Sequence, residues 1–172
     1  MKIAQVSPLW ESVPPKLYGG TERIVSYLTE ELVRLGHDVT LFASGDSTTA
    51  AKLKAVTPEA LRLSTGIFNR GAPMTYQLEQ AFGASSNELH IIHSHLDFIG
   101  FPIARRCPTP VITTMHGRLD LPELVPVFRE YTEMPLVSIS NSQRRPLPCA
   151  TWQSTVYHGL PEDLYRLEEM PG

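Results

Sequence analysis

The sequence predicts an α/β protein with an open parallel sheet and helices on both faces, a three-layer α/β/α arrangement. Three observations support this fold class. Short apolar segments alternate along the chain with helical or irregular ones. The first segment is apolar enough for a strand buried on both faces of a sheet. Polar residues and glycines follow the predicted strands, at the edge where such sheets bind ligands.

The opening forty-odd residues predict one strand–helix–strand unit. Residues 2–7 are mostly apolar and form the first predicted strand, which several prolines end. From residue 24 to 35 the apolar residues recur on one helical face, and Gly36 ends that helix in a position suited to a left-handed cap. Residues 38–43 predict the second strand.

The alternation continues to the end of the chain. Enrichment in β-branched and apolar residues predicts four more strands, at 90–95, 110–116, 136–140 and 154–157. Helices are predicted at 98–106 and over part of 121–131. The signal is weak between residues 48 and 86, where 59–63 and 76–82 are the predicted helices.

Length and composition narrow the class of protein. A chain of 172 residues with 42% hydrophobic residues can close one core. A net charge of −3 without a basic stripe argues against a nucleic-acid partner. No apolar run approaches the roughly 18 residues of a membrane span, and the N-terminus leads into a strand instead of a signal-peptide core. We therefore expect one cytoplasmic domain.

Missing patterns disfavour several kinds of site. The chain lacks the P-loop pattern, the G-x-S-x-G elbow of serine hydrolases and the dinucleotide pattern G-x-G-x-x-G, so Asp46 has little support as a ribose ligand. Cys107 and Cys149 lie beside prolines without CxxC spacing, which predicts free thiols.

The paired glycines Gly19 and Gly20 are the most informative feature of the sequence. They lie just before an amphipathic helix, where backbone N–H groups and the helix N-terminus can face an anion. This arrangement indicates a phosphate-facing loop. The alternative is a simple helix-entry turn.

Polar side chains follow three later strands of the predicted sheet. They are His95 and Asp97, then His116, then Ser142 and Arg144. Each has a structural alternative: His116 as a strand-end histidine with ordinary partners, and the last pair as part of a solvated loop. His93 and His95 point to the same face of a strand, but no third ligand is evident, so we predict no metal site.

Seven segments in this order and spacing resemble one known family. They are MKIAQVSP at 1–8, YGGTER at 18–23, LGHDVTLF at 35–42, IHSH at 92–95, TMHG at 114–117, SISNS at 138–142 and VYHG at 156–159. They resemble the retaining glycosyltransferases of family 4, which have the two-domain GT-B fold.

The resemblance implies that residues 1–160 are the N-terminal, acceptor-side Rossmann-like domain and that residues 161–172 begin the interdomain linker. It also implies that the C-terminal donor domain is absent from this sequence. The implied activity is transfer of a hexosyl group from a nucleotide sugar to a hydroxyl of a sugar or small-molecule acceptor, with no further cofactor. The chain alone is expected to be inactive.

The resemblance also implies roles for the residues singled out above. Gly19 and Gly20 would approach the donor diphosphate, and His116 would contact the donor sugar in the cleft. The expected acceptor-binding residues are His95, Asp97, Ser142 and Arg144. The alternative to an enzyme is a non-enzymatic α/β binding module, which could form a homodimer through the surface facing the absent domain.

Overall fold

The computed structural model describes residues 1–62, 64–83, 88–162 and 164–165. Within them, seven parallel strands form one sheet in the order β3-β2-β1-β4-β5-β6-β7. The strands are β1 (Lys2–Val6), β2 (Asp38–Ser44), β3 (Lys52–Thr57), β4 (Ile91–Ser94), β5 (Val111–Met115), β6 (Leu136–Ser138) and β7 (Trp152–Thr155). The described helices are α1 (Gly20–Arg34), α2 (Gly71–Phe82), the 3₁₀ helix η2 (Asp97–Gly100), α3 (Phe101–Ala104), α4 (Leu124–Glu130) and α5 (Asn141–Arg144).

The direction in which strands are added reverses at β1. The chain first adds β2 and β3 on one side of β1, then places β4 on its other side and continues outward to β7. In an open parallel sheet, the carboxyl ends of the two strands at such a switch point border a crevice. The fold therefore places a natural binding position beside the ends of β1 and β4.

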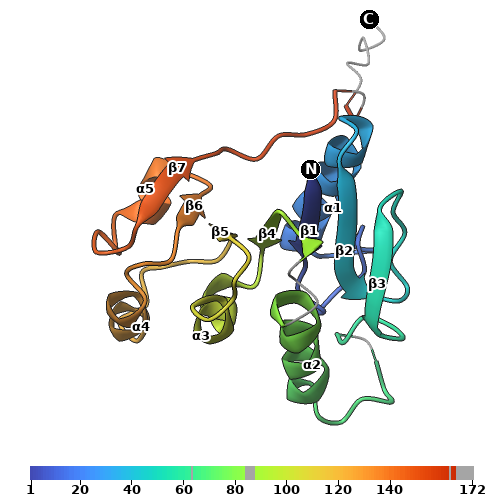
Figure 1. The fold of residues 1–172 in the computed structure, drawn as a ribbon, viewed down its shortest axis with the longest axis horizontal. Helices are drawn as coiled ribbons and strands as arrows, with labels where there is room; N and C mark the ends of the chain where they lie inside the picture. The colour runs from blue at the N-terminus through green and yellow to red at the C-terminus, as the bar shows by residue number, and fades with distance from the viewer. Residues whose placement is uncertain (63, 84–87, 163, 166–172) are drawn as a thin grey trace, which may run out of the picture.

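The two faces of the sheet have separate apolar clusters. Phe42 of β2 belongs to the large cluster, whereas its neighbours Leu41 and Ala43 pack in a smaller one with Val25 of α1. Successive side chains of a strand point to opposite faces, so α1 covers one face. Helices α2, α3 and α4 lie in a row along the other (Figure 1). The predicted doubly wound, three-layer arrangement is confirmed.

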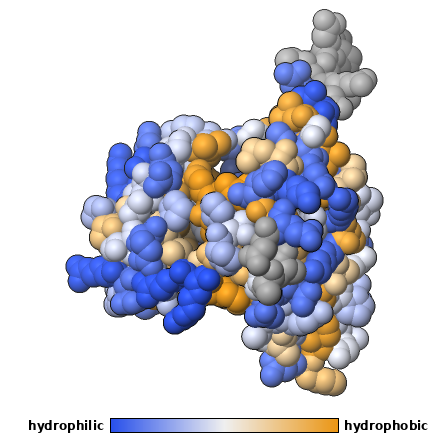
Figure 2. Space-filling view, viewed as in Figure 1, coloured by the Kyte–Doolittle hydropathy of each residue, from blue (hydrophilic) through white to orange (hydrophobic). Residues whose placement is uncertain are grey.

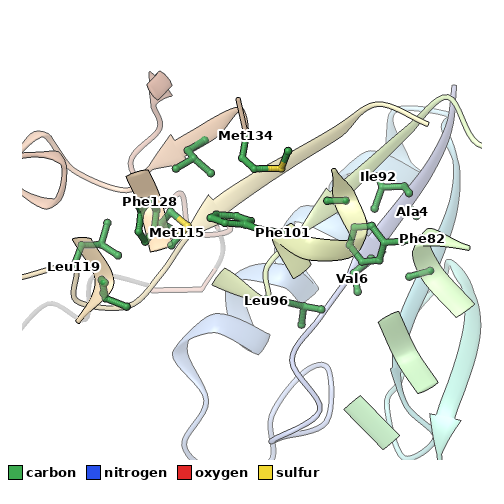
Figure 3. Close-up of a cluster of buried hydrophobic side chains, with 14 of the residues drawn as sticks. Ala4, Val6, Phe82, Ile92, Leu96, Phe101, Met115, Leu119, Phe128 and Met134 are labelled. Carbon is green, nitrogen blue, oxygen red and sulfur yellow. The ribbon is translucent and has the colours of Figure 1, made fainter. Parts of the chain in front are cut away.

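The large cluster joins the sheet to this row of helices. Phe101 of α3 lies in its middle (Figure 3) and is fully buried. Its ring meets that of Phe128 of α4 edge-to-face, with centroids 5.6 Å apart. Hydrophobic residues also reach the surface in a band between the hydrophilic parts that carry α4 and α5 on the left and β2 and β3 on the right (Figure 2).

Most predicted elements are confirmed, including the helix at 76–82, which is part of α2, but two other parts of the weak middle region differ from the prediction. The strand β3 was not expected, because it is a half-exposed strand at the sheet edge in which lysines alternate with apolar residues. The predicted helix at 59–63 is wrong over residues 59–62, which bend and turn; Leu63 lies outside the described residues. There the N–H groups of Leu61 and Arg62 donate to the carbonyls of Leu9 and Trp10, so long-range pairing replaces helical bonds.

Three smaller expectations can be compared with the structure. Gly36 has φ +81, the left-handed conformation predicted after the first helix. Cys107 and Cys149 are not joined in a disulfide, as predicted. No described helix is both long enough and apolar enough to cross a membrane. Most of the predicted linker at 161–172 lies outside the described residues.

Candidate functional site

A pocket of about 400 Å³ opens at the switch point of the sheet. Its walls come from the loop after β1, the start of α1, one face of α2 and the segments that follow β4, β5 and β7. Five of the residues expected from the sequence line this one pocket: Gly19, Gly20, His95, Asp97 and His116. The topology thus gathers groups that lie nearly one hundred residues apart in the sequence.

The two glycines differ in what their surroundings require. A Cβ added at Gly19, the N-cap of α1, would lie 2.7 Å from Pro15 Cβ and 3.0 Å from Glu11 Cγ. A Cβ added at Gly20 would meet nothing within 4 Å. Gly19 is therefore needed for packing, whereas Gly20 leaves the backbone open toward the pocket. The first amides of α1 have no partner within the helix, as at every helix N-terminus.

His95 is held by protein partners on both sides of its ring. Its side chain is 2% exposed, with Nε2 2.8 Å from Gln5 Oε1 and Nδ1 2.8 Å from His116 Nε2. Neither nitrogen is left for a ligand. This placement does not favour the direct acceptor contact expected from the sequence, because an acceptor hydroxyl would have to displace Gln5 or His116.

Two more histidines complete a stacked group. The rings of His93 and His95 have centroids 4.2 Å apart, and His158, from the segment after β7, lies 5.3 Å from His116. Burial lowers the pKa of His93 to about 4 and that of His116 to about 3, and it lowers the pKa of His95 well below its usual range. These three imidazoles are therefore neutral at pH 7.

The histidine group does not have the arrangement of a metal site. His95 and His116 face each other through a nitrogen–nitrogen hydrogen bond, so one of the two nitrogens carries a proton and cannot be a ligand. Across the described residues, no group of three or more His, Cys, Asp or Glu side chains is suited to hold a metal ion.

Asp97 has an unusual backbone and a partly buried carboxyl group. Its φ of 50 lies in the left-handed region, which non-glycine residues seldom adopt. The carboxylate accepts a hydrogen bond from the backbone N–H of His116 at 3.2 Å, which ties the end of β4 to the end of β5. Burial raises the pKa of this carboxyl, so it is a better proton acceptor than an exposed aspartate.

Ser142 and Arg144 lie outside the pocket. Both belong to α5, where Ser142 is exposed and its hydroxyl lies 3.0 Å from that of Ser140. Arg144 donates to Thr155 Oγ1 at 3.2 Å, and its guanidinium lies 5.6 Å from the centre of the Trp152 ring. The structure therefore does not bring these two residues together with the other five.

Two residues of the site were missed by the sequence analysis: Glu22, which lines the pocket, and Gln5, which contacts the pocket-lining His95. Glu22 is 4% exposed, and burial raises its pKa. Its signal was a carboxylate two residues after the glycine pair, in the first turn of the helix. Gln5 is fully buried in β1. Its signal was a single polar side chain inside an apolar strand, which must find a partner when buried.

The rim of the pocket near α1 carries aromatic and charged groups. Tyr18 is 76% exposed, and the Arg62 guanidinium lies over its ring at 5.6 Å. Arg62 also forms an ion pair with the buried Glu11. Because Arg62 was expected in a helix, nothing in the sequence placed it beside the glycine loop.

Comparison with known proteins identifies the family. A family model described as Glycosyltransferase Family 4 matches residues 18–150. The chain belongs to glycosyltransferase family 4. This match spans the glycine loop, the ends of β4 and β5 and all of α5. Among curated proteins, none matches the sequence significantly.

Solved structures share the fold of this family 4 chain. AviGT4, a glycosyltransferase involved in avilamycin A biosynthesis, is 21% identical with a TM-score of 0.55; the match covers 85% of this chain and 38% of AviGT4. A glycosyltransferase from Rickettsia africae ESF-5 is 14% identical, with a TM-score of 0.55 and coverages of 89% and 42%. Sucrose-phosphate synthase from Thermosynechococcus elongatus is also 14% identical, with a TM-score of 0.56 and coverages of 90% and 47%.

These likenesses establish the architecture. The chain is a Rossmann-like domain that matches one half of GT-B structures, as the resemblance implied. It spans less than half the length of the solved structures named above.

Proposed function

We propose that this chain is the acceptor-side half of a retaining glycosyltransferase that transfers a hexosyl group from a nucleotide sugar to a hydroxyl acceptor. The observation that carries the proposal is the pocket at the switch point, because a family 4 domain there combines an open glycine loop, a neutral histidine and a partly buried carboxyl. A donor domain would form the opposite wall. The chain alone would then be inactive, since half a cleft can neither hold the donor nor exclude water.

The glycine loop is the proposed site of the donor diphosphate. The backbone at Gly20 is open to the pocket, and the amides at the start of α1 add partial positive charge. These dipoles would stabilise the negative charge that develops on the leaving nucleoside diphosphate. The bond that breaks joins the sugar C1 to the phosphate oxygen.

His116 and Asp97 are the proposed contacts for the reacting sugars. The neutral imidazole of His116 would bind a hydroxyl of the donor sugar and so orient its reacting face. The partly buried carboxylate of Asp97 would orient the acceptor hydroxyl and take up its proton as the new bond to C1 forms. Retention follows when the acceptor attacks from the face that the diphosphate leaves. His95 supports His116 in this scheme, and Ser142 and Arg144 have no part in it.

The proposal is tested by comparing the chain alone with the chain joined to a donor domain. We expect calorimetry to detect little affinity between the 172-residue chain and nucleotide sugars. Joined in frame to the donor domain of another family 4 enzyme, the chain should transfer sugar. His116→Ala in that fusion should lower kcat/KM by about 100-fold or more. The matched control is His90→Ala, because His90 is exposed at the opposite ends of the strands and its side chain, among the described hydrogen bonds, accepts only from the N–H of Lys2.

Two results would count against the proposal: tight stoichiometric nucleotide binding by the chain alone, or equal activity of the two histidine variants. A stable dimer without transfer would favour the non-enzymatic binding module. The segment after β7 offers apolar surface for such a contact, with Val156 57% exposed, Tyr157 65% and Leu160 54%.

A further inference from the structure

We propose that Gln5 is a positioning residue that fixes the proton of His116 on Nε2, so that the buried Nδ1 of this pocket-lining ring is an unpaired acceptor. The pocket histidine would then accept a hydrogen bond from its ligand and could not donate one. The inference rests on the proposed function of this pocket, because it specifies which kind of ligand atom His116 binds.

Gln5 lies where it can control two histidines at once. It is fully buried in the central strand β1, next to β4. Its amide oxygen lies 2.8 Å from His95 Nε2, and its amide nitrogen lies 3.4 Å from His93 Nδ1. A buried amide in an apolar strand is costly unless its hydrogen bonds are satisfied, and here both ends have partners.

The chemistry of the amide sets the direction of the hydrogen bonds. An amide oxygen only accepts, so His95 carries its proton on Nε2. Because His95 is neutral, its Nδ1 is unprotonated and accepts from Nε2–H of His116. His116 is neutral as well, which leaves its own Nδ1 without a proton. One amide orientation thus determines the tautomers of two residues.

The hydrogen bond between Gln5 and His93 is consistent with the same orientation of the Gln5 amide. The amide N–H₂ group only donates, so His93 Nδ1 accepts and His93 carries its proton on Nε2. That nitrogen lies 2.7 Å from Thr114 Oγ1, which can accept the hydrogen bond. Every side-chain nitrogen and oxygen in these two series of hydrogen bonds therefore has a suitable partner, except the Nδ1 of His116.

That last nitrogen is the informative exception. His116 Nδ1 is buried and has no hydrogen-bond partner in the structure. If the Gln5 amide were turned over, every bond would reverse, and an unpaired N–H would stand at this position. Buried N–H groups without partners are rarer in proteins than unpaired acceptors. The 2.8 Å contact to His95 also suits an N–H···O bond. Both facts favour the direction assigned here.

The assignment has a consequence for the ligand. An unprotonated nitrogen binds a hydroxyl or another donor and is repelled by a phosphate oxygen. His116 would therefore select a sugar hydroxyl, while the diphosphate lies elsewhere in the cleft. Gln5 would contribute to sugar recognition without touching the sugar.

The proton positions can be measured directly in the chain without any sugar. Long-range ¹H–¹⁵N NMR spectra of the protein labelled at histidine, recorded at pH 7, distinguish the two tautomers of each ring. We expect His93, His95 and His116 all to carry the proton on Nε2. A wild-type spectrum with the His116 proton on Nδ1 would overturn the proposal, whatever any variant does.

Gln5→Met tests whether the amide is the cause. It removes the acceptor of His95 at similar volume, so neither direction of the His95–His116 hydrogen bond keeps an advantage, and both rings should show a mixture of tautomers. The matched control is Gln77→Met, because Gln77 is another buried glutamine whose amide donates to the Ser7 and Phe42 carbonyls. It should leave the three tautomers unchanged.

An unchanged His116 tautomer in Gln5→Met would refute the role of Gln5. If this variant does not fold, the wild-type spectrum still decides the tautomers. Failure of this inference is distinguishable from failure of the proposed function. An active fusion with the wrong tautomer refutes only the former, and the expected tautomer in an inactive fusion refutes only the latter.

Discussion

Alanine at Gly19 and alanine at Gly20 should have opposite effects on stability. At Gly19 the new methyl group would lie 2.7 Å from Pro15 Cβ and 3.0 Å from Glu11 Cγ. Pro15 is a ring fixed to the backbone, and Glu11 is 7% exposed and paired with Arg62, so neither side chain can move away freely. Overpacking of this kind costs about 1–3 kcal/mol. At Gly20 the methyl group meets nothing, and we expect a change of at most about 0.5 kcal/mol, toward greater stability.

Urea unfolding of both variants beside the wild type measures the difference. With an m value of about 2 kcal/mol/M, Gly19→Ala should lower the midpoint by about 0.5–1.5 M, and Gly20→Ala should shift it by less than about 0.3 M. The m values should stay equal, since the denatured states are alike. Equal midpoints for the two variants would show that Gly19 is not required for packing, and the distinction between the two glycines would be lost.

Two further predictions concern the histidines and the core. The native state keeps His93 and His116 neutral, with pKa values of about 4 and about 3, whereas the unfolded chain binds these protons below pH 6.5 or so. Stability should therefore decrease as the pH falls from 7 to 5, by about 2–4 kcal/mol in urea titrations; a constant midpoint would contradict the burial of these rings. Phe101→Ala should cost about 3–5 kcal/mol, because this fully buried ring lies in the middle of the large cluster. Phe68→Ala, at a side chain 98% exposed, should change the unfolding free energy by less than about 0.5 kcal/mol, and a similar loss in both variants would argue against this core.

Local sequence patterns correctly predicted those helices and strands whose own residues show which of their faces is buried. The strand β1 is apolar on both faces, α1 has a regular apolar stripe, and Gly36 takes the left-handed conformation expected of a helix-ending glycine. The strand β3 was missed because an edge strand is half-exposed and carries alternating lysines. Residues 59–62 were predicted wrongly because their N–H groups pair with a loop fifty residues earlier, a partner that no local window contains.

For the site too, local sequence signals identified some residues, whereas the positions of others depended on the tertiary structure. Glycines before a helix and polar residues after parallel strands are local signals, and they pointed to Gly19, Gly20, Asp97 and His116, which line one pocket in the structure. The order of segments along the sequence does not say how far a predicted strand lies from the switch point. Ser142 and Arg144 follow β6, which is three places from β1 and near the other end of the sheet.

The sequence by itself determined the fold class, the family and five of the residues at the pocket, because hydrophobic periodicity and residue type act over a few neighbouring positions. Only the tertiary structure decided how those residues are used. The pairing of Gln5 with His95, and of His95 with His116, joins strands up to ninety residues apart and depends on which face of the sheet each side chain occupies. Hydrogen-bond partners at such separations exist only once the sheet has formed.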